Sequence, residues 1–307
     1  MSNDRVRETP TEFTVEANGI DFACRRAGDG DRLALCLHGF PDDAGSMDPI
    51  LDRLADAGFT AVAPNMRGYA PTDPAPDGDY SPTALGDDAV ALADAVPAEL
   101  DVDADDPVLV GHDWGAVAAY AADRTDPDAF ARMVAMAVPP GFEALLFAYP
   151  RQLLRSWYMW VFQLPDVPER ALRWRDFAIL EALWTLWSPG WEAPGERIES
   201  VTATFRAGDT TDHAIQYYRD TVGAQLSSLA GDLLRLDPPS IDDVPPVRTP
   251  TLVIAGEDDR CIAPALFEHA GAVIEDARVV RIRDAGHFVH LERPEVVGEE
   301  IVEYVTD

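Results

Sequence analysis

Short apolar runs and helical stretches alternate along much of this chain. Continuous apolar runs are typical of parallel strands buried on both faces of a sheet, and amphipathic stretches between them are typical of crossover helices. Ahead of these runs, residues 11–26 alternate around Asn18-Gly19, which is a hairpin signal. The pattern predicts an α/β protein whose mostly parallel, twisted sheet begins with an antiparallel hairpin and is flanked by helices. The expected parallel strands are 33–37, 59–63, 107–110, 132–138, 251–256 and 278–287, and the clearest crossover helices are 49–58 and 83–96.

The strand pattern is interrupted in the middle of the chain. Across residues 141–232 strand signals vanish and helical spacing dominates, and six of the seven tryptophans fall within residues 157–191. The proline-rich stretch 237–250 then leads back into apolar runs. We therefore expect one α/β core domain, residues 1–140 and 233–307, which carries an inserted helical cap, residues 141–232.

The charge balance is strongly acidic. The chain has 55 acidic and 24 basic residues, and because all 24 are arginine, lysine is absent; the formal net charge is −31. A field of this sign repels a phosphate backbone, so nucleic acid is not expected as a partner. The acidity is spread along the whole chain and resembles that of proteins from extreme halophiles, where molar salt shortens the Debye length to about 3 Å.

The polar start of the chain and the spacing of its cysteines narrow the expected class of protein further. Residues 1–12 are polar, without the apolar run of a leader, and no apolar run reaches membrane-spanning length. We expect a soluble, cytoplasmic protein without a membrane partner; its oligomeric state stays open, a homo-oligomer included. Cys24, Cys36 and Cys261 lack metal-ligand spacing, so we expect buried thiols, with neither a disulfide nor a metal.

The stretch VLVGHDWGAVAAY, residues 108–120, carries the clearest chemical signal. It predicts a strand, a sharp turn and a helix, which is the frame of a nucleophile elbow, but Asp113 stands where serine is commoner. Three further segments fit the same site. They are HGFP at 38–41, LVIAGEDDRCIAP at 252–264 and DAGHFVHLERPE at 284–295.

Together these four segments resemble the α/β-hydrolase superfamily, and the resemblance covers nearly the whole chain. It implies Asp113 as the nucleophile, His287 as the general base and Asp259 as the acid that orients the histidine, in the chain order expected for this fold. The superfamily pattern G-x-x-D favours Asp259, although the neighbouring Asp258 stays open as an alternative.

A carboxylate nucleophile changes the substrate that is expected. An aspartate, with a reference pKa of about 3.9, is already ionised at neutral pH, whereas a serine must first lose its proton. Asp113 can therefore displace a leaving group from an sp³ carbon and form an alkyl ester, which water activated by His287 hydrolyses. The backbone N–H groups of Phe40 and Trp114 are expected to form the oxyanion hole of that second step. Epoxides and haloalkanes both present such a carbon.

Tyrosines in the cap favour the epoxide. Epoxide opening generates an alkoxide that needs a hydroxyl donor, whereas a halide needs only N–H donors. Two cap segments resemble soluble epoxide hydrolases: Tyr158 heads a Y-x-x-x-F-Q-x-P run, and Tyr218, which follows Tyr217, directly precedes Arg219. HGFP also matches the HGxP of that family better than the HG-Asn common in haloalkane dehalogenases. We therefore expect an epoxide hydrolase that forms a vicinal diol through an alkyl ester of Asp113.

Two alternatives stay open. A haloalkane or haloacid dehalogenase would use the same Asp113, and the indole N–H of Trp114 would then be a halide ligand. A non-catalytic ligand-binding protein on a hydrolase scaffold is the second alternative, because a fold does not fix a function. The intact set of two aspartates and a histidine argues against it.

The other candidate residues are expected to contact the substrate or to support the site. A small molecule and water are the expected partners, and no cofactor is expected. His112 and His38 are expected to hold backbone geometry beside the elbow and the oxyanion loop, while His213, His269 and His290 are expected to have no catalytic role. The residues expected to contact the substrate are Trp114, His38, Pro41, Trp157, Tyr217 and Phe288.

The acidic composition generates a prediction about salt. We expect folding and activity to decline in dilute buffer, because at about 0.01 M salt the Debye length grows to about 30 Å and the acidic side chains repel one another. Melting temperature and turnover, measured from molar salt down to dilute buffer, would check this. Full activity and an unchanged melting temperature after dialysis into dilute buffer would refute it.

Overall fold

The computed structural model describes residues 10–102, 105–233 and 240–307. The polar start of the chain, residues 1–9, and the first residues of the proline-rich stretch, 237–239, lie outside the described residues. The strands are β1 (Thr11–Ala17), β2 (Ile20–Ala27), β3 (Arg32–Leu37), β4 (Phe59–Pro64), β5 (Val108–His112), β6 (Arg132–Met136), β7 (Thr251–Gly256) and β8 (Ala277–Ile282). The α-helices are α1 (Asp48–Asp56), α2 (Pro82–Leu100), α3 (Trp114–Thr125), α4 (Phe142–Ala148), α5 (Pro150–Arg155), α6 (Trp157–Val161), α7 (Val167–Arg173), α8 (Ala178–Trp187), α9 (Gly195–Arg206), α10 (Thr210–Leu233), α11 (Ala270–Val273), α12 (Val289–Glu292) and α13 (Pro294–Thr306). Short 3-10 helices are η1 (Ala44–Met47), η2 (Ile241–Asp243) and η3 (Pro264–His269).

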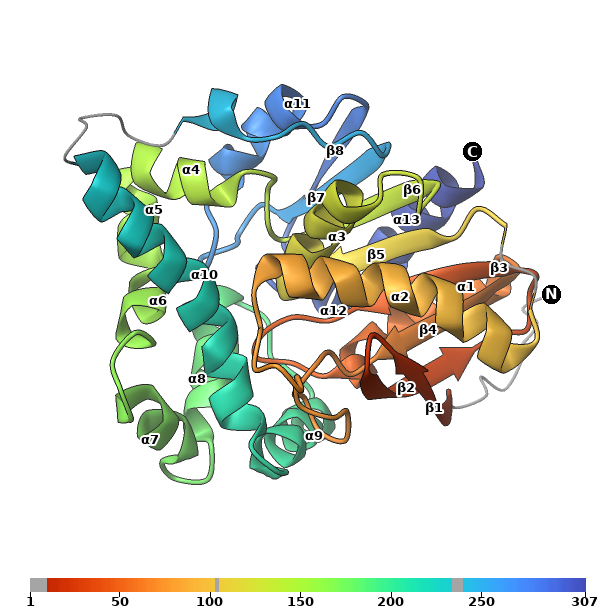
Figure 1. Cartoon of the computed structure of the whole chain (residues 1–307), viewed down its shortest axis with the longest axis horizontal. Coiled ribbons are helices and arrows are strands. Elements are labelled where there is room, and N and C mark those ends of the chain that lie inside the picture. Colours follow the sequence, from red (N-terminus) through yellow and green to blue (C-terminus); the bar gives the residue numbers. More distant parts are fainter. Residues whose placement is uncertain (1–9, 103–104, 234–239) are drawn as a thin grey trace.

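The described strands form one eight-stranded sheet in the order β1-β2-β4-β3-β5-β6-β7-β8 (Figure 1). β1, β2 and β4 pair antiparallel, and every pair from β4–β3 to β7–β8 is parallel. The expected hairpin turns at Asn18 and Gly19, which both have positive φ, 50° and 75°. The predicted mostly parallel sheet with an antiparallel start is thus confirmed.

Helices cover both faces of this sheet, which explains the continuous apolar runs. In β3, Leu33, Leu35 and Leu37 belong to one core cluster, while Ala34 and Cys36 belong to a second. The first cluster includes α2, α3 and inserted helices, and the second includes α1, α12 and α13. Since successive side chains of a strand point to opposite faces, a strand covered on both sides must be apolar at every position.

Two strands end earlier than the sequence pattern predicts. β6 stops at Met136 because Ala137 adopts a left-handed conformation, with φ 65°. β8 stops at Ile282, and the remainder of the apolar run 278–287 is a loop and not a strand. That loop carries His287 to the edge of the sheet at which the parallel strands end.

Helices α4 to α10 connect β6 to β7, and the described residues between those strands include no strand. Figure 1 shows these helices gathered on the left, to one side of the sheet. Side chains link them to the core: the Trp184 indole N–H donates to Pro41 O at 2.8 Å, and the Ser200 and Thr204 hydroxyls donate to the Asp43 carboxylate. In the part of the chain that the structure describes, no helix is long and apolar enough to cross a lipid bilayer.

Glycines bring the segments around Asp113 into backbone contact. A Cβ added to Gly115 would lie 2.2 Å from Leu37 O, and one added to Gly111 would lie 2.2 Å from Gly115 O. Both contacts are with backbone atoms, which cannot move aside as the end of a flexible side chain can. α3 can therefore lie this close to β3 and β5 only because Gly111 and Gly115 have no side chain.

We predict that Gly115→Ala lowers the free energy of unfolding by about 1–3 kcal/mol, because overpacked cores shift backbone and side chains. Gly271→Ala is the matched control, since a Cβ at that helical position meets no atom within 4 Å. Thermal or urea unfolding of both variants at constant salt would check the difference. Equal stability of Gly115→Ala and the parent would contradict the predicted backbone clash.

Candidate active site

Asp113 occupies the turn between β5 and α3. Its backbone has φ 51° and ψ −111°, a conformation that non-glycine residues rarely adopt. Hydrogen bonds on both sides hold the turn: Asp113 N–H donates to Met136 O, and Asp113 O accepts from Val117 N–H, both at 3.1 Å. A strained, well-supported residue between strand and helix is the geometry of a nucleophile elbow.

The two carboxylate oxygens of Asp113 have different neighbours. Oδ1 accepts a hydrogen bond from Phe40 N–H at 2.8 Å, whereas Oδ2 faces His287 Nε2 at 3.6 Å. Gly39 permits this approach, because a Cβ there would lie 2.3 Å from Asp113 Cβ. Trp114 is the first residue of α3, so its N–H is one of the N-terminal N–H groups that have no partner within the helix. Oδ1 is thus held by the backbone, while Oδ2 stays available to react.

His287 is oriented by Asp259. Its Nδ1 lies 3.0 Å from Asp259 Oδ2, and the other oxygen of Asp259 accepts the backbone N–H groups of Cys261 and Ile262 at 2.6 and 2.9 Å. His287 and Asp259 are both buried, whereas Asp258 is exposed. Of the two adjacent aspartates that the sequence left open, Asp259 is therefore the one that contacts the histidine.

The charges of this group reinforce one another. Burial by itself would lower the pKa of His287, but the charges and hydrogen bonding of Asp259 and Asp113 outweigh it and raise that pKa to about 10. Burial likewise opposes ionisation of Asp113, yet the neighbouring His287 holds its pKa below the usual value. Two unit charges about 4 Å apart interact by roughly 4 kcal/mol near a protein surface. Neutralising Asp113 would therefore bring the pKa of His287 back towards neutrality, where the ring can act as a base.

Two tyrosines of the inserted helices lie close to this group. Tyr158 on α6 and Tyr218 on α10 are buried, and their rings meet edge to face with centroids 5.7 Å apart. The Tyr158 hydroxyl lies 3.3 Å from Cys261 Sγ, and the Tyr218 hydroxyl has no hydrogen-bond partner among the described residues. Burial, with a further contribution from the charge of Asp113, raises the pKa of both tyrosines well above the usual range. Both hydroxyls therefore remain protonated donors.

Tyr217 and Trp157, which directly precede Tyr218 and Tyr158 in the sequence, are placed differently from those two tyrosines. The Tyr217 hydroxyl donates to Arg67 O at 2.8 Å, so it is engaged away from Asp113, although the ring lies edge to face with Trp114. Trp157 is 44% exposed and lies outside the buried core cluster. The structure thus does not bring Trp157 together with the buried site, because its side chain is on the outer side of α6.

The other residues expected near the substrate mainly support the site. The His38 ring is fixed at both nitrogens, by Gly39 O and by Met66 N–H at 3.0 Å each, and burial lowers its pKa to about 4. Pro41 O accepts the Trp184 indole N–H, and the Phe288 ring stacks on Trp184 with centroids 4.3 Å apart. These contacts position the backbone on both sides of Asp113.

Several residues of the site carry no signal that the sequence patterns could reveal. Trp187 lies between Tyr158 and His287, at centroid distances of 4.9 and 5.4 Å, and its indole N–H has no partner in the described part of the chain. The buried Tyr69 hydroxyl is likewise without a described partner, and its ring lies edge to face with His38. Helical spacing marks Trp187 only as a buried residue, and no motif distinguishes Tyr69. A group of metal-ligand type, Asp42, His112 and His290, also lies beside the site and is described below.

Comparison with known proteins shows the family of this chain. A model of the alpha/beta hydrolase family matches residues 34–300. The AB hydrolase superfamily protein YfhM of Bacillus subtilis is 28% identical over 296 residues, which cover 95% of this chain and 96% of that protein. Epoxide hydrolase A of Mycobacterium tuberculosis is 29% identical over 335 residues, covering 97% and 98% of the two chains.

Solved structures show the same relationship. The crystal structure of epoxide hydrolase A from Mycobacterium thermoresistibile has a TM-score of 0.76 at 27% identity, covering 97% of this chain and 98% of that one. The epoxide hydrolase of Bacillus megaterium shares the fold, with a TM-score of 0.80 at 22% identity over 96% of this chain and 100% of that one. The chain belongs to the alpha/beta hydrolase family. It is an epoxide hydrolase-like enzyme of that family, and both predictions are confirmed.

Proposed function

We propose that this enzyme hydrolyses an epoxide to a vicinal diol through a covalent ester of Asp113. The observation that carries the proposal is the unequal environment of the two Asp113 oxygens, one held by Phe40 N–H and the other facing His287 at 3.6 Å. An aspartate used only as a general base would not need its second oxygen placed against a backbone N–H. A nucleophile does, because that oxygen becomes the oxyanion when its ester is hydrolysed.

The first step forms the ester. Oδ2 of Asp113 bonds to one epoxide carbon as the C–O bond of that carbon breaks, and the electron pair passes to the epoxide oxygen. Tyr158 and Tyr218 are the donors for this oxygen, since both hydroxyls are buried and protonated next to the nucleophile. No base is needed, because Asp113 is already ionised.

The second step hydrolyses the ester. Esterification removes the charge of Asp113, so His287 first gives up its own proton, which replaces the proton that the tyrosines passed to the epoxide oxygen. Still held by Asp259, His287 then takes a proton from a water molecule whose oxygen bonds to Cγ of Asp113. Phe40 N–H stabilises the resulting charge on Oδ1, and we assign the second donor to Trp114 N–H. Collapse breaks the bond between Cγ and Oδ2, so the diol leaves with Oδ2 as its new hydroxyl oxygen. The two protons of the water replace those taken up by the diol oxygens.

The inserted helices supply both tyrosines and so act as the cap of this site. In this proposal the core consists of residues 1–140 and 233–307, and residues 141–232 are the cap. Similarity to the epoxide hydrolases A of two mycobacteria supports the assignment of the substrate class. A small epoxide and water are then the partners of the reaction. A cytoplasmic location remains a prediction, and the oligomeric state stays open.

One observation favours a second candidate, a dehalogenase. The indole N–H groups of Trp114 and Trp187 are both buried beside Asp113 and His287 without a hydrogen-bond partner among the described residues. Two such donors could bind a departing halide, which needs no proton. The tyrosine hydroxyls distinguish the candidates, because only an alkoxide requires them.

We predict that Tyr158→Phe and Tyr218→Phe each slow epoxide opening by about 100-fold, the usual contribution of a general acid. Rapid-mixing measurement of the alkylation step, with styrene oxide at molar salt, would test each variant. The control is Tyr304→Phe, because Tyr304 in α13 packs against Arg132 and is not one of the residues of the candidate site.

Two results would decide against the epoxide. One is parental opening rates in both cap variants. The other is halide release from a bromoalkane by a parent enzyme that leaves epoxides intact, which would establish the dehalogenase.

The origin of the transferred oxygen tests the covalent step. A single turnover in ¹⁸O-water, with enzyme in excess, is expected to give mostly unlabelled diol and a labelled peptide containing Asp113, because the diol takes its oxygen from the side chain. His287→Gln is expected to stop after alkylation, leaving an adduct whose added mass equals that of the epoxide. His269→Gln, the same change outside the site, is expected to turn over normally. Label in the diol of the first turnover would show that water attacks the epoxide directly.

A further inference from the structure

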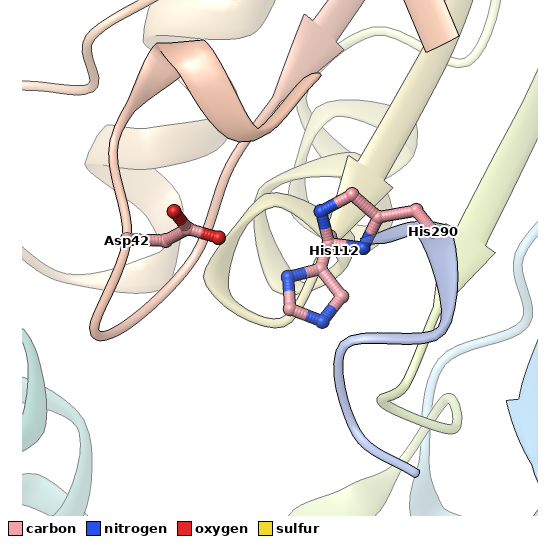
Figure 2. A group of neighbouring side chains, drawn as sticks. All are labelled: Asp42, His112 and His290. Atoms are coloured by element: carbon pink, nitrogen blue, oxygen red, sulfur yellow. The ribbon is translucent and has the colours of Figure 1, made fainter. Parts of the chain in front are cut away.

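A second buried polar cluster lies next to the active site and takes no part in the proposed reaction. Asp42, His112 and His290 are completely buried, and one oxygen or ring nitrogen of each lies within 4.8 Å of those of the other two. Figure 2 shows the Asp42 carboxylate facing the two imidazole rings. The three residues come from the loop after β3, the end of β5 and α12, so they converge only in the folded chain.

The polar atoms of this cluster have no partners of their own. Asp42 Oδ2, His112 Nδ1 and both ring nitrogens of His290 form no hydrogen bond within residues 10–102, 105–233 and 240–307. Buried polar atoms are almost always paired, so a set of them facing one centre indicates a bound ion or water molecule. The lone pairs and protons of these atoms indicate which of the two is bound.

Two of the atoms present fixed lone pairs to the centre. His112 Nε2 lies 2.9 Å from His287 O, and because a carbonyl only accepts, Nε2 carries the proton and Nδ1 is bare. Asp42 Oδ1 accepts Asp43 N–H at 2.9 Å and faces the Arg197 guanidinium at 3.8 Å, which leaves Oδ2 free. Hydrogen bonds of this kind, made by the far side of a ligand, are what orient histidines and carboxylates towards a metal ion.

We propose that Asp42, His112 and His290 bind a divalent transition-metal ion such as Zn²⁺. Two imidazoles and one carboxylate suit such ions better than Mg²⁺ or Ca²⁺. Three atoms at most 4.8 Å apart surround a centre at most about 2.8 Å from each, so each would move by at most about 0.8 Å to reach a Zn²⁺ bond of roughly 2.0–2.2 Å. Rotation of the side chains, the unpaired His290 above all, supplies such a movement.

The charges around the cluster accommodate a cation. Two positive groups lie beside the cluster, and carboxylates neutralise both: Arg197 is bound to Asp43, and His287, whose ring centroid is 5.2 Å from that of His112, lies between Asp113 and Asp259. The ion would link the segment that bears Phe40, the residue before Asp113 and the helix that follows His287. Its proposed role is therefore structural: the ion joins the three segments without touching the substrate.

Metal content of the purified protein tests the site. Protein produced with Zn²⁺ or Co²⁺ is dialysed at high salt against excess Mg²⁺, which removes ions held weakly by the acidic surface. We expect about one ion per chain, a visible cobalt spectrum and a higher melting temperature than that of the chelator-treated protein.

His290→Gln and Asp42→Asn are expected to lose the ion or bind it at least about tenfold more weakly. His269→Gln is the matched control, because it removes one imidazole outside the cluster and is expected to keep the ion. If Asp42→Asn fails to fold, His290→Gln, which changes no charge on a carboxylate, still decides the question. A parent protein that holds no Zn²⁺ or Co²⁺ after dialysis overturns the proposal and leaves a water molecule as the occupant of the cluster. Equal retention by His290→Gln and His269→Gln also overturns it, since the ion would then be elsewhere.

Discussion

His287 lies buried between two carboxylates, with Asp259 at 3.0 Å and Asp113 at 3.6 Å, and the rest of the site depends on this arrangement. A buried imidazole flanked in this way retains its proton, and it shields one negative charge from the other. The backbone must hold both carboxylates in place, through Phe40 N–H on one side and the N–H groups of Cys261 and Ile262 on the other. In the proposed reaction, the same coupling would let His287 act as a base once Asp113 has been esterified and has lost its charge.

The inserted helices change what this charged group can do. The core alone provides a carboxylate, an acid–histidine pair and backbone donors, which are compatible with several reactions of the fold. Tyr158, Tyr218 and Trp187 of these helices add two buried hydroxyls and an indole N–H group, and the indole of Trp114 in α3 lies beside them. The leaving atom selects between the two sets of donors, since an alkoxide needs a proton and a halide does not. In the proposed function, the substrate class therefore depends on where the inserted helices meet α3.

Patterns along the chain predicted the elements and most of the side chains that the structure brings together in the candidate site. Apolar runs marked β3, β4, β5 and β7 because strands covered on both faces must be apolar throughout. The elbow marked Asp113 because a strand, a tight turn with small residues and a helix leave a recognisable local signature. Strand ends were less well predicted, as at Ala137, because a single backbone angle ends β6 without any change in hydrophobicity.

The sequence by itself therefore determined the α/β architecture, the helical insertion and the segments that bring Asp113, Asp259 and His287 together, since these depend on local periodicity and short motifs. Only the tertiary structure decided that Asp259 and not Asp258 faces His287, and that the Tyr217 hydroxyl is bound to Arg67 while that of Tyr218 is free of any described partner. It also brought His290 to Asp42 and His112. The physical reason is the same in each case: neighbouring residues of one type look alike in sequence, and only packing between distant segments determines which side chain is buried and what it meets.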